Sequence, residues 1–347
     1  MRKLIICIAS VLTAASVLGA APVKHNVMSP DGKINVEVDL NSGIKYSVTM
    51  NGVKMINPSE ISMTLTDGTV YGESAKLVKA SSRSVNETID AIVYRKSKVE
   101  DNFNELTLKF QKFSVIFRAY NDGIAYRFVS ASKQPFNVAS EKATFDFSSD
   151  YKAYIPYVQQ NDEQLETQFH NSFENKYTHQ RISEFDKTHY AFLPVMVEAE
   201  NGVKMVISES DLRHYPGMFL YNGDGNRSFE GVFAPYPKNR VPEDGDRIIS
   251  MYVDGVEDFI AKCDPSCSFP WRLVAFSTSD EQLVDNDMVY RLASPQNPSA
   301  DFSWVKPGKV AWDWWNSWNL YNVDFVSGVN TETYKYNACE KFIEKNK

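Results

Sequence analysis

The sequence predicts a mainly β protein, with a β-sandwich over most of the chain and one β/α unit near its end. Three observations indicate this fold class. Short segments alternate apolar and polar residues from residue 33 to about 310, Asp-Gly and Asn-Gly pairs punctuate them, and helical periodicity is nearly absent before residue 328. Because alternation with a period of two places every second side chain on one face of a strand, each sheet can bury one face.

The N-terminus has the order of a secretory signal. Met1-Arg-Lys3 is positively charged, residues 4–18 are mostly apolar, and residues 19–21 are small. This order predicts a leader over residues 1–21 that is cleaved on export. The apolar stretch is shorter than the roughly 20 residues that cross a bilayer, and no later segment is apolar enough, so we expect no membrane span.

Composition indicates a large core and excludes one class of partner. The chain has 347 residues, of which 43% are hydrophobic and 13% aromatic, so one large β domain or two domains is expected. The formal net charge is −7, and no run of Lys or Arg forms a basic stripe. Nucleic acid is therefore not an expected partner.

The first part of the mature chain is expected to be the sandwich, over residues 22–303. Its clearest alternating segments are 34–40, 45–50, 61–65 and 113–118. Asp-Gly and Asn-Gly pairs favour tight hairpins, so the strands should pair antiparallel. Such pairs or close variants occur at 31–32, 51–52, 67–68, 121–123 and 201–202.

The segment 162–174 interrupts this pattern. It is polar, long and poor in turn residues, which indicates a loop or a short helix lying over the sheet. Long loops in compact domains are uncommon unless they serve a function, so this segment is a candidate site.

The cysteines leave several interpretations open. Cys7 would be lost with the leader, and Cys339 lies on an expected helix, where packing is the simplest role. Cys263 and Cys267 flank a turn that contains Pro265, so they could form a local disulfide in an oxidising compartment or remain free structural thiols. A metal site is a weaker interpretation, because no further Cys or His lies nearby.

The pattern changes after residue 303. Residues 304–308 predict a linker, and 309–312 predict a strand that leads into an aromatic loop. A helix should begin near Asn330, which is a favourable N-cap, and carry apolar residues at i, i+4 and i+8, namely Tyr334, Ala338 and Phe342. Strand, loop and helix form one unit of a β/α barrel, so residues 304–347 are expected to be the start of a truncated barrel.

Four of the six tryptophans fall within seven residues: Trp312, Trp314, Trp315 and Trp318. Indole faces stack on sugar rings, so this cluster favours a carbohydrate pocket over a large aromatic core. Asp313 supports the sugar interpretation, because a dry core would have to satisfy its carboxylate.

Carboxylates are the remaining chemical candidates, since glycoside hydrolysis needs two of them on either side of the bond. For any one of them a solvated or ion-paired role is the default. The histidines show neither zinc-ligand spacing nor the motifs of a nucleophilic triad, whereas a calcium site remains possible. The acidic residues in loop or aromatic context are Asp162, Glu163, Glu184, Glu209, Asp211 and Asp313.

Several motifs together resemble glycoside hydrolase family 97. The resemblance implies an N-terminal β-super-sandwich, a catalytic (β/α)8 barrel, an active-site calcium ion and export to the bacterial periplasm. Members are inverting α-glucosidases or retaining α-galactosidases, and the tryptophan run is more similar to the retaining branch. In chain order, the segments that carry the resemblance are 29–32, 118–128, 155–164, 208–217, 270–272 and 311–319.

The resemblance also implies roles for particular residues. Glu163 lies seven residues after Pro156, where the family places a glutamate that reaches the barrel mouth and binds calcium. Trp312, Asp313, Trp314 and Trp315 match the end of the first barrel strand, where barrel enzymes build their pockets. The family's catalytic carboxylates lie on later barrel strands, so none is expected before Lys347.

The expected protein is therefore the N-terminal part of an exported, calcium-dependent α-glycosidase that acts on a saccharide with a terminal α-linked sugar. A retaining α-galactosidase is favoured, and the 347-residue chain alone is expected to be inactive. An inverting α-glucosidase of the same family is the first alternative. A noncatalytic carbohydrate-binding β-sandwich is the second.

Overall fold

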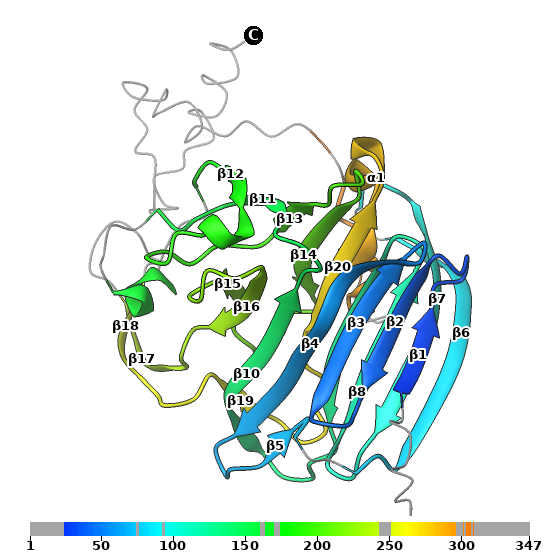
Figure 1. Cartoon of the computed structure of the whole chain (residues 1–347). Helices are drawn as coiled ribbons and strands as arrows, with labels where there is room; N and C mark the ends of the chain where they lie inside the picture. Colours follow the sequence, from blue (N-terminus) through cyan, green and yellow to red (C-terminus); the bar gives the residue numbers. More distant parts are fainter. Residues whose placement is uncertain are drawn as a thin grey trace, which may run out of the picture.

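The structure is a computed structural model that describes residues 24–73, 76–91, 94–159, 164–169, 174–242, 251–295, 301, 303–306 and 308. Within these residues, two large antiparallel sheets pack face to face (Figure 1). The predicted mainly β sandwich is confirmed. The signal over residues 1–21 and the barrel unit over 309–347 lie outside the described residues.

The first sheet has nine strands in the described part of the chain. Its edge-to-edge order is β1 (Lys24–Met28), β2 (Ile34–Asp39), β3 (Ile44–Met50), β4 (Val53–Leu65), β10 (Phe136–Asp146), β16 (Ser228–Phe233) and β15 (Met218–Tyr221), with β5 (Val70–Tyr71) beside β4 and β19 (Ala261–Cys263) beside β10.

The second sheet also has nine strands among the described residues. They run in the order β12 (Thr178–Arg181), β11 (Lys152–Ile155), β13 (Val195–Glu198), β14 (Lys204–Ser210), β20 (Trp271–Ser277), β9 (Gly123–Ser130), β8 (Phe113–Tyr120), β7 (Lys98–Lys109) and β6 (Lys79–Asp90). The outermost strand, β6, pairs with β7 and is exposed along most of its length.

Turn chemistry sets the register of the hairpins. Met50 pairs with Val53, so Asn51 and Gly52 form a two-residue turn between β3 and β4. Their φ angles are 51° and 78°, as the tight turn favoured in hairpins requires. The alternating pattern of the sequence thereby becomes two sheets that bury the faces they turn toward each other.

Aromatic side chains fill the space between the sheets. The ring of Tyr46, on the first sheet, lies 6.2 Å from that of Phe117 and 5.4 Å from that of Tyr126, both on the second sheet. All three side chains are almost fully buried. These contacts place the main core between the two sheets, where burial of apolar area stabilises the fold.

A second, smaller core lies on the outer face of the second sheet. Two short helices, α1 (Asp280–Val284) and α2 (Met288–Leu292), follow β20 there. Met288 and Leu292 pack with Trp271 and Leu273. Gly123 permits the close approach of α2, because a Cβ atom there would lie 2.2 Å from the Met288 sulfur.

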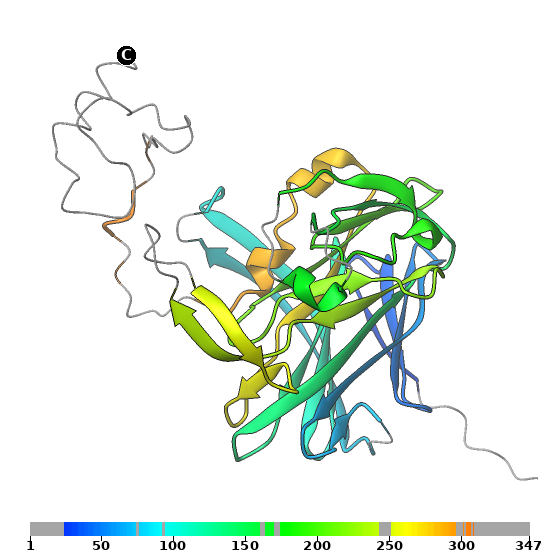
Figure 2. The same cartoon turned by 90° about the vertical axis from the view of Figure 1, so that its left-hand side faces the viewer.

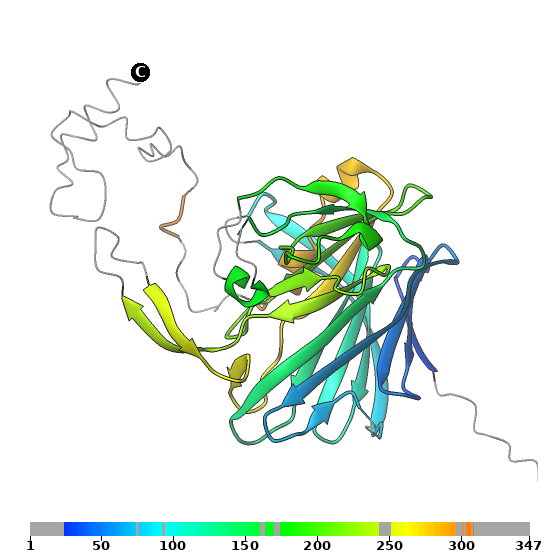
Figure 3. The same ribbon diagram turned by 60° about the vertical axis from the view of Figure 1, so that its left-hand side comes forward.

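A two-stranded ribbon projects from the sandwich, as Figures 2 and 3 show. It consists of β17 (Pro237–Pro242) and β18 (Met251–Val256). At its base, the Tyr236 amide donates to the Phe259 carbonyl at 2.8 Å. Among the described residues, no helix is long and apolar enough to cross a lipid bilayer.

Candidate functional site

The candidate loop lies between β11 and β12, at a corner where the two sheets meet. Its first residues form a joint: Tyr157 pairs with Ala191, and Ala191 in turn pairs with Leu220 of β15. The Val158 amide donates to the Tyr190 carbonyl at 2.9 Å, and the Phe192 amide donates to the Pro156 carbonyl at 2.9 Å. Because β11 and β15 belong to different sheets, this joint fixes the base of the loop to both.

A short 3-10 helix, η1 (Leu165–Phe169), follows within the loop. Its Gln168 side chain is completely buried. The Gln168 amide nitrogen donates to the Thr188 carbonyl at 2.7 Å, and its amide oxygen accepts from the Tyr190 backbone at 2.8 Å. Gln168 thus completes the hydrogen bonding of the neighbouring segment, which a buried backbone requires.

The return of the loop is fixed through Tyr157. Asn175 donates through its side chain to the Tyr157 carbonyl at 2.9 Å. The buried Tyr157 hydroxyl accepts from the Gln180 side chain at 2.9 Å and from the Asp186 backbone at 2.8 Å. Burial raises the pKa of Tyr157 to about 12, so the hydroxyl stays neutral at physiological pH.

Aromatic rings surround the end of η1. The Phe169 ring lies 5.1 Å from that of Tyr190 and 5.2 Å from that of Phe219. The Phe192 ring is 5.1 Å from Phe219. Phe169, Phe192 and Phe219 are only half-buried, so an apolar surface lies beside the loop.

Replacing Gln168 with alanine is expected to loosen this loop. The change leaves the Tyr190 amide and the Thr188 carbonyl without their partner, at a cost of about 1–3 kcal/mol. Hydrogen exchange should speed up over residues 164–192, and the free energy of unfolding should fall. Gln164→Ala is the matched control, because Gln164 is exposed in the same loop. Equal exchange in both variants would show that the Gln168 contacts do not hold the loop.

Three of the sequence-predicted carboxylates have structural partners. Glu184 accepts from the Arg181 backbone at 2.9 Å and caps the short helix η2 (Ile182–Glu184). Asp211 accepts from the Ser294 amide at 3.1 Å and from its hydroxyl at 2.6 Å, which holds the segment after α2. Glu209 belongs to an ion cluster with Arg272. These positions support the fold and offer no acid/base pair.

The ion cluster of Glu141, Glu209 and Arg272 lies between the sheets. Arg272 of β20 donates to both carboxylate oxygens of Glu141 on β10, each at 2.8 Å, and also to Glu209 on β14. The Arg272 side chain is 1% exposed and that of Glu141 is 3% exposed. Burial alone would lower the pKa of Arg272, but the two carboxylates outweigh burial and raise that pKa. Burial raises the pKa of Glu209.

The other candidate site residues lie outside the described residues: Asp162, Glu163, Trp312, Asp313, Trp314 and Trp315. Calcium needs six to eight oxygen ligands. In the part of the chain that the structure describes, no three His, Cys, Asp or Glu side chains converge as metal ligands.

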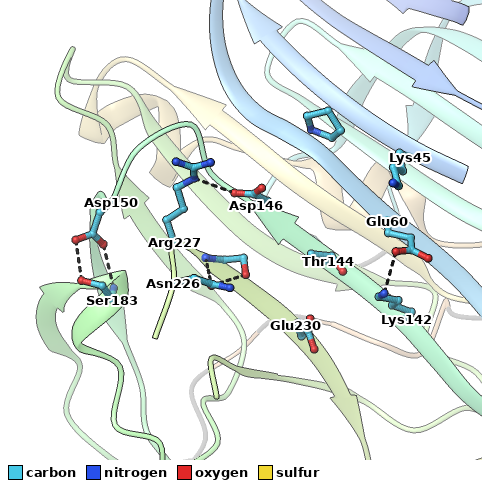
Figure 4. Close-up of a pocket in the computed structure, with 12 residues that line it drawn as sticks. Lys45, Glu60, Lys142, Thr144, Asp146, Asp150, Ser183, Asn226, Arg227 and Glu230 are labelled. Atoms are coloured by element: carbon cyan, nitrogen blue, oxygen red, sulfur yellow. Dashed lines mark hydrogen bonds and ion pairs between the residues drawn. The ribbon is translucent and has the colours of Figure 1, made fainter. Parts of the chain in front are cut away.

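The first sheet also has a polar hollow of 640 Å³ on its outer face (Figure 4). Two ion pairs lie among its charged groups: Lys142 lies 2.9 Å from Glu60, and Arg227 lies 3.2 Å from Asp146. Among the described residues, no aromatic side chain lines the hollow. These features are typical of a solvated sheet surface and do not suit a sugar pocket.

Comparison with known proteins shows which protein family this chain belongs to. A family model described as Glycosyl-hydrolase 97 N-terminal matches residues 27–295. The chain is 45% identical over 337 residues to a retaining alpha-galactosidase of Bacteroides thetaiotaomicron, covering 96% of this chain and 50% of the relative. It is 22% identical to a probable retaining alpha-galactosidase of Streptomyces bingchenggensis, covering 80% of this chain and 39% of the relative.

Solved structures share the fold. A variant of a Glycoside Hydrolase Family 97 enzyme from Pseudoalteromonas sp. superposes with a TM-score of 0.72 at 20% identity, covering 92% of this chain and 45% of that one. A beta-arabinopyranosidase gives a TM-score of 0.66 at 20% identity, covering 80% and 44%. At this identity the likeness shows the fold alone.

Residues 27–295 thus have a β-sandwich fold and match the N-terminal region that defines glycoside hydrolase family 97. The chain belongs to glycoside hydrolase family 97, which confirms the resemblance of the sequence motifs. It spans about half the length of the curated relatives it matches.

Proposed function

We propose that this chain is the N-terminal part of a retaining α-galactosidase that hydrolyses terminal α-galactosides. One observation carries the proposal: the 45% identity to a retaining alpha-galactosidase, which extends over 96% of the chain. The tryptophan run of residues 312–318 supports it, because it resembles the same branch of the family. Both point to the galactosidase branch rather than to the inverting α-glucosidases.

In this proposal the sandwich presents the loop of residues 159–177 to the active site. The joint through Ala191 and the Asn175 side chain hold the two ends of this loop, and the Gln168 contacts hold its middle. Glu163 would contribute a ligand to calcium, and the Trp312–Trp315 segment would contribute one wall of the sugar pocket. A nucleophilic carboxylate and an acid from the barrel would perform the retaining reaction.

Calcium and export are further parts of the proposal. A hard cation such as calcium binds carboxylates and sugar hydroxyls, and would hold them in place in the pocket. The signal-like order of residues 1–21 favours export, and the family resemblance favours the bacterial periplasm. The carboxylate of Glu163 fits the ligand chemistry of calcium.

The test is hydrolysis of p-nitrophenyl α-galactoside and p-nitrophenyl α-glucoside by the protein from the full reading frame. It is assayed with calcium and with a chelator, beside the 347-residue chain. We expect cleavage of the galactoside, loss of activity with chelator, and no activity from the 347-residue chain. Cleavage of the glucoside alone would move the assignment to the inverting branch. Binding of sugar without any cleavage would favour a noncatalytic carbohydrate-binding sandwich.

A further inference from the structure

Cys263 and Cys267 flank a tight turn that is held firmly on both sides. Cys263 ends β19 and pairs with Phe136 of β10. The Cys267 carbonyl accepts from the Ser130 amide at 2.9 Å, and the Ser266 amide donates to the Ser132 carbonyl at 2.9 Å. The backbone of the turn therefore fixes where the two cysteines lie.

The two thiols face one another across this turn. The two side chains lie close enough for each thiol to be the main cause of the other's pKa shift. Both side chains are half-buried and pack against the main core. The Cys263 thiol lowers the pKa of Cys267, and the Cys267 thiol raises the pKa of Cys263. Cys267 is therefore the better nucleophile of the pair, because the thiolate is the reactive form.

The surroundings do not favour a metal site. Across the residues that the structure describes, no third His, Cys, Asp or Glu side chain joins the pair as a metal ligand. Tyr71 lies nearby, and its hydroxyl is 3.1 Å from that of Ser130. Of the interpretations that the sequence leaves open, a bond between the two sulfurs and a free thiol pair remain.

We propose that Cys263 and Cys267 form a reversible disulfide that closes this turn when the protein meets a disulfide oxidant. The Cys267 thiolate attacks one sulfur of the oxidant, which forms a mixed disulfide and releases one thiolate. Cys263 then loses its proton and attacks the Cys267 sulfur, which releases the second thiolate. Two protein thiols are oxidised, and one molecule of oxidant is reduced to two thiols.

The bond acts on the junction between the sheets. β19 pairs with β10 of the first sheet, and Phe269, just after the turn, leads into β20 of the second sheet. A covalent link between residues 263 and 267 reduces the conformational freedom of the unfolded chain. It therefore raises the free energy of the unfolded state relative to that of the folded state. Formation of this disulfide does not depend on whether the chain is part of a galactosidase.

Peptide mapping tests the proposal. The reduced 347-residue chain is equilibrated with oxidised glutathione, and the remaining free thiols are then alkylated. Trypsin cleaves after Lys262 and Arg272, so both cysteines are released in the single peptide Cys263–Arg272. We expect this peptide to lose the mass of two hydrogen atoms and to resist alkylation. Glutathione adducts on the peptide, or complete alkylation of both thiols, would overturn the proposal and leave a free thiol pair.

Thermal unfolding gives an independent readout. Oxidation should raise the unfolding midpoint of the chain by roughly 3 °C, given the small loop that the bond closes. The double variant Cys263→Ser with Cys267→Ser should show no response to oxidant. The matched control, Cys339→Ser, should keep the full response. A response that persists in the double variant would assign the effect to other thiols and contradict the inference.

Discussion

Replacing Arg272 with methionine is expected to lower the free energy of unfolding by about 3–5 kcal/mol, which is a large fraction of the stability of a typical domain. The change removes the only positive charge of the Glu141, Glu209 and Arg272 cluster. Glu141 would then remain between the sheets with its carboxylate buried and without its bidentate partner. Denaturant unfolding, followed by fluorescence, measures the loss.

Two further variants isolate the cause of this loss. Arg227→Met removes an arginine of the same type whose side chain is 51% exposed and pairs with Asp146, so its cost should be below about 1 kcal/mol. The double variant Arg272→Met with Glu141→Leu should recover part of the stability, because it removes the stranded charge as well. If Arg272→Met and Arg227→Met cost the same, the buried cluster contributes nothing specific to the fold.

The second large effect concerns the proposed function. Changing Glu163 to glutamine in the protein from the full reading frame is expected to lower kcat/KM on p-nitrophenyl α-galactoside by about 100-fold. In the proposed site an amide would replace a charged calcium ligand, so the variant should also need more calcium for half-maximal activity. The measurement is a calcium titration of initial rates.

Glu166→Gln is the matched control, because Glu166 is exposed on η1 in the same loop. It should leave both the rate and the calcium requirement unchanged. An active wild type together with a fully active Glu163→Gln variant would remove Glu163 from the calcium site without affecting the assignment of the enzyme class. An inactive wild type would instead question the proposed function itself.

Local sequence features predicted the sandwich because strands and hairpins are encoded locally. The segments 34–40 and 45–50 are strands over Ile34–Asp39 and Ile44–Met50, joined to their neighbours by the expected turns. The predicted loop or short helix of 162–174 contains the 3-10 helix Leu165–Phe169. The helices α1 and α2 were missed, since five residues are too few to show a helical period.

Contacts between distant residues could not be predicted in the same way. Glu209 stands in a motif-rich segment and therefore looked like a catalytic candidate, but its partner Arg272 lies 63 positions away. Gln168 was not predicted at all, because a glutamine in a polar loop carries no sign of burial. In both cases the role is set by which strands become neighbours, and local spacing does not contain that information.

The edge strand β6 has a consequence for behaviour in concentrated solution. It is 12 residues long, and its outer edge has no strand beside it among the described residues, a geometry that can template aggregation. Its charged residues, Lys79, Arg83, Glu87 and Asp90, are spread along its length and exposed. A second molecule adding a strand there would have to desolvate these charges, so the protein should stay dispersed despite this long open edge.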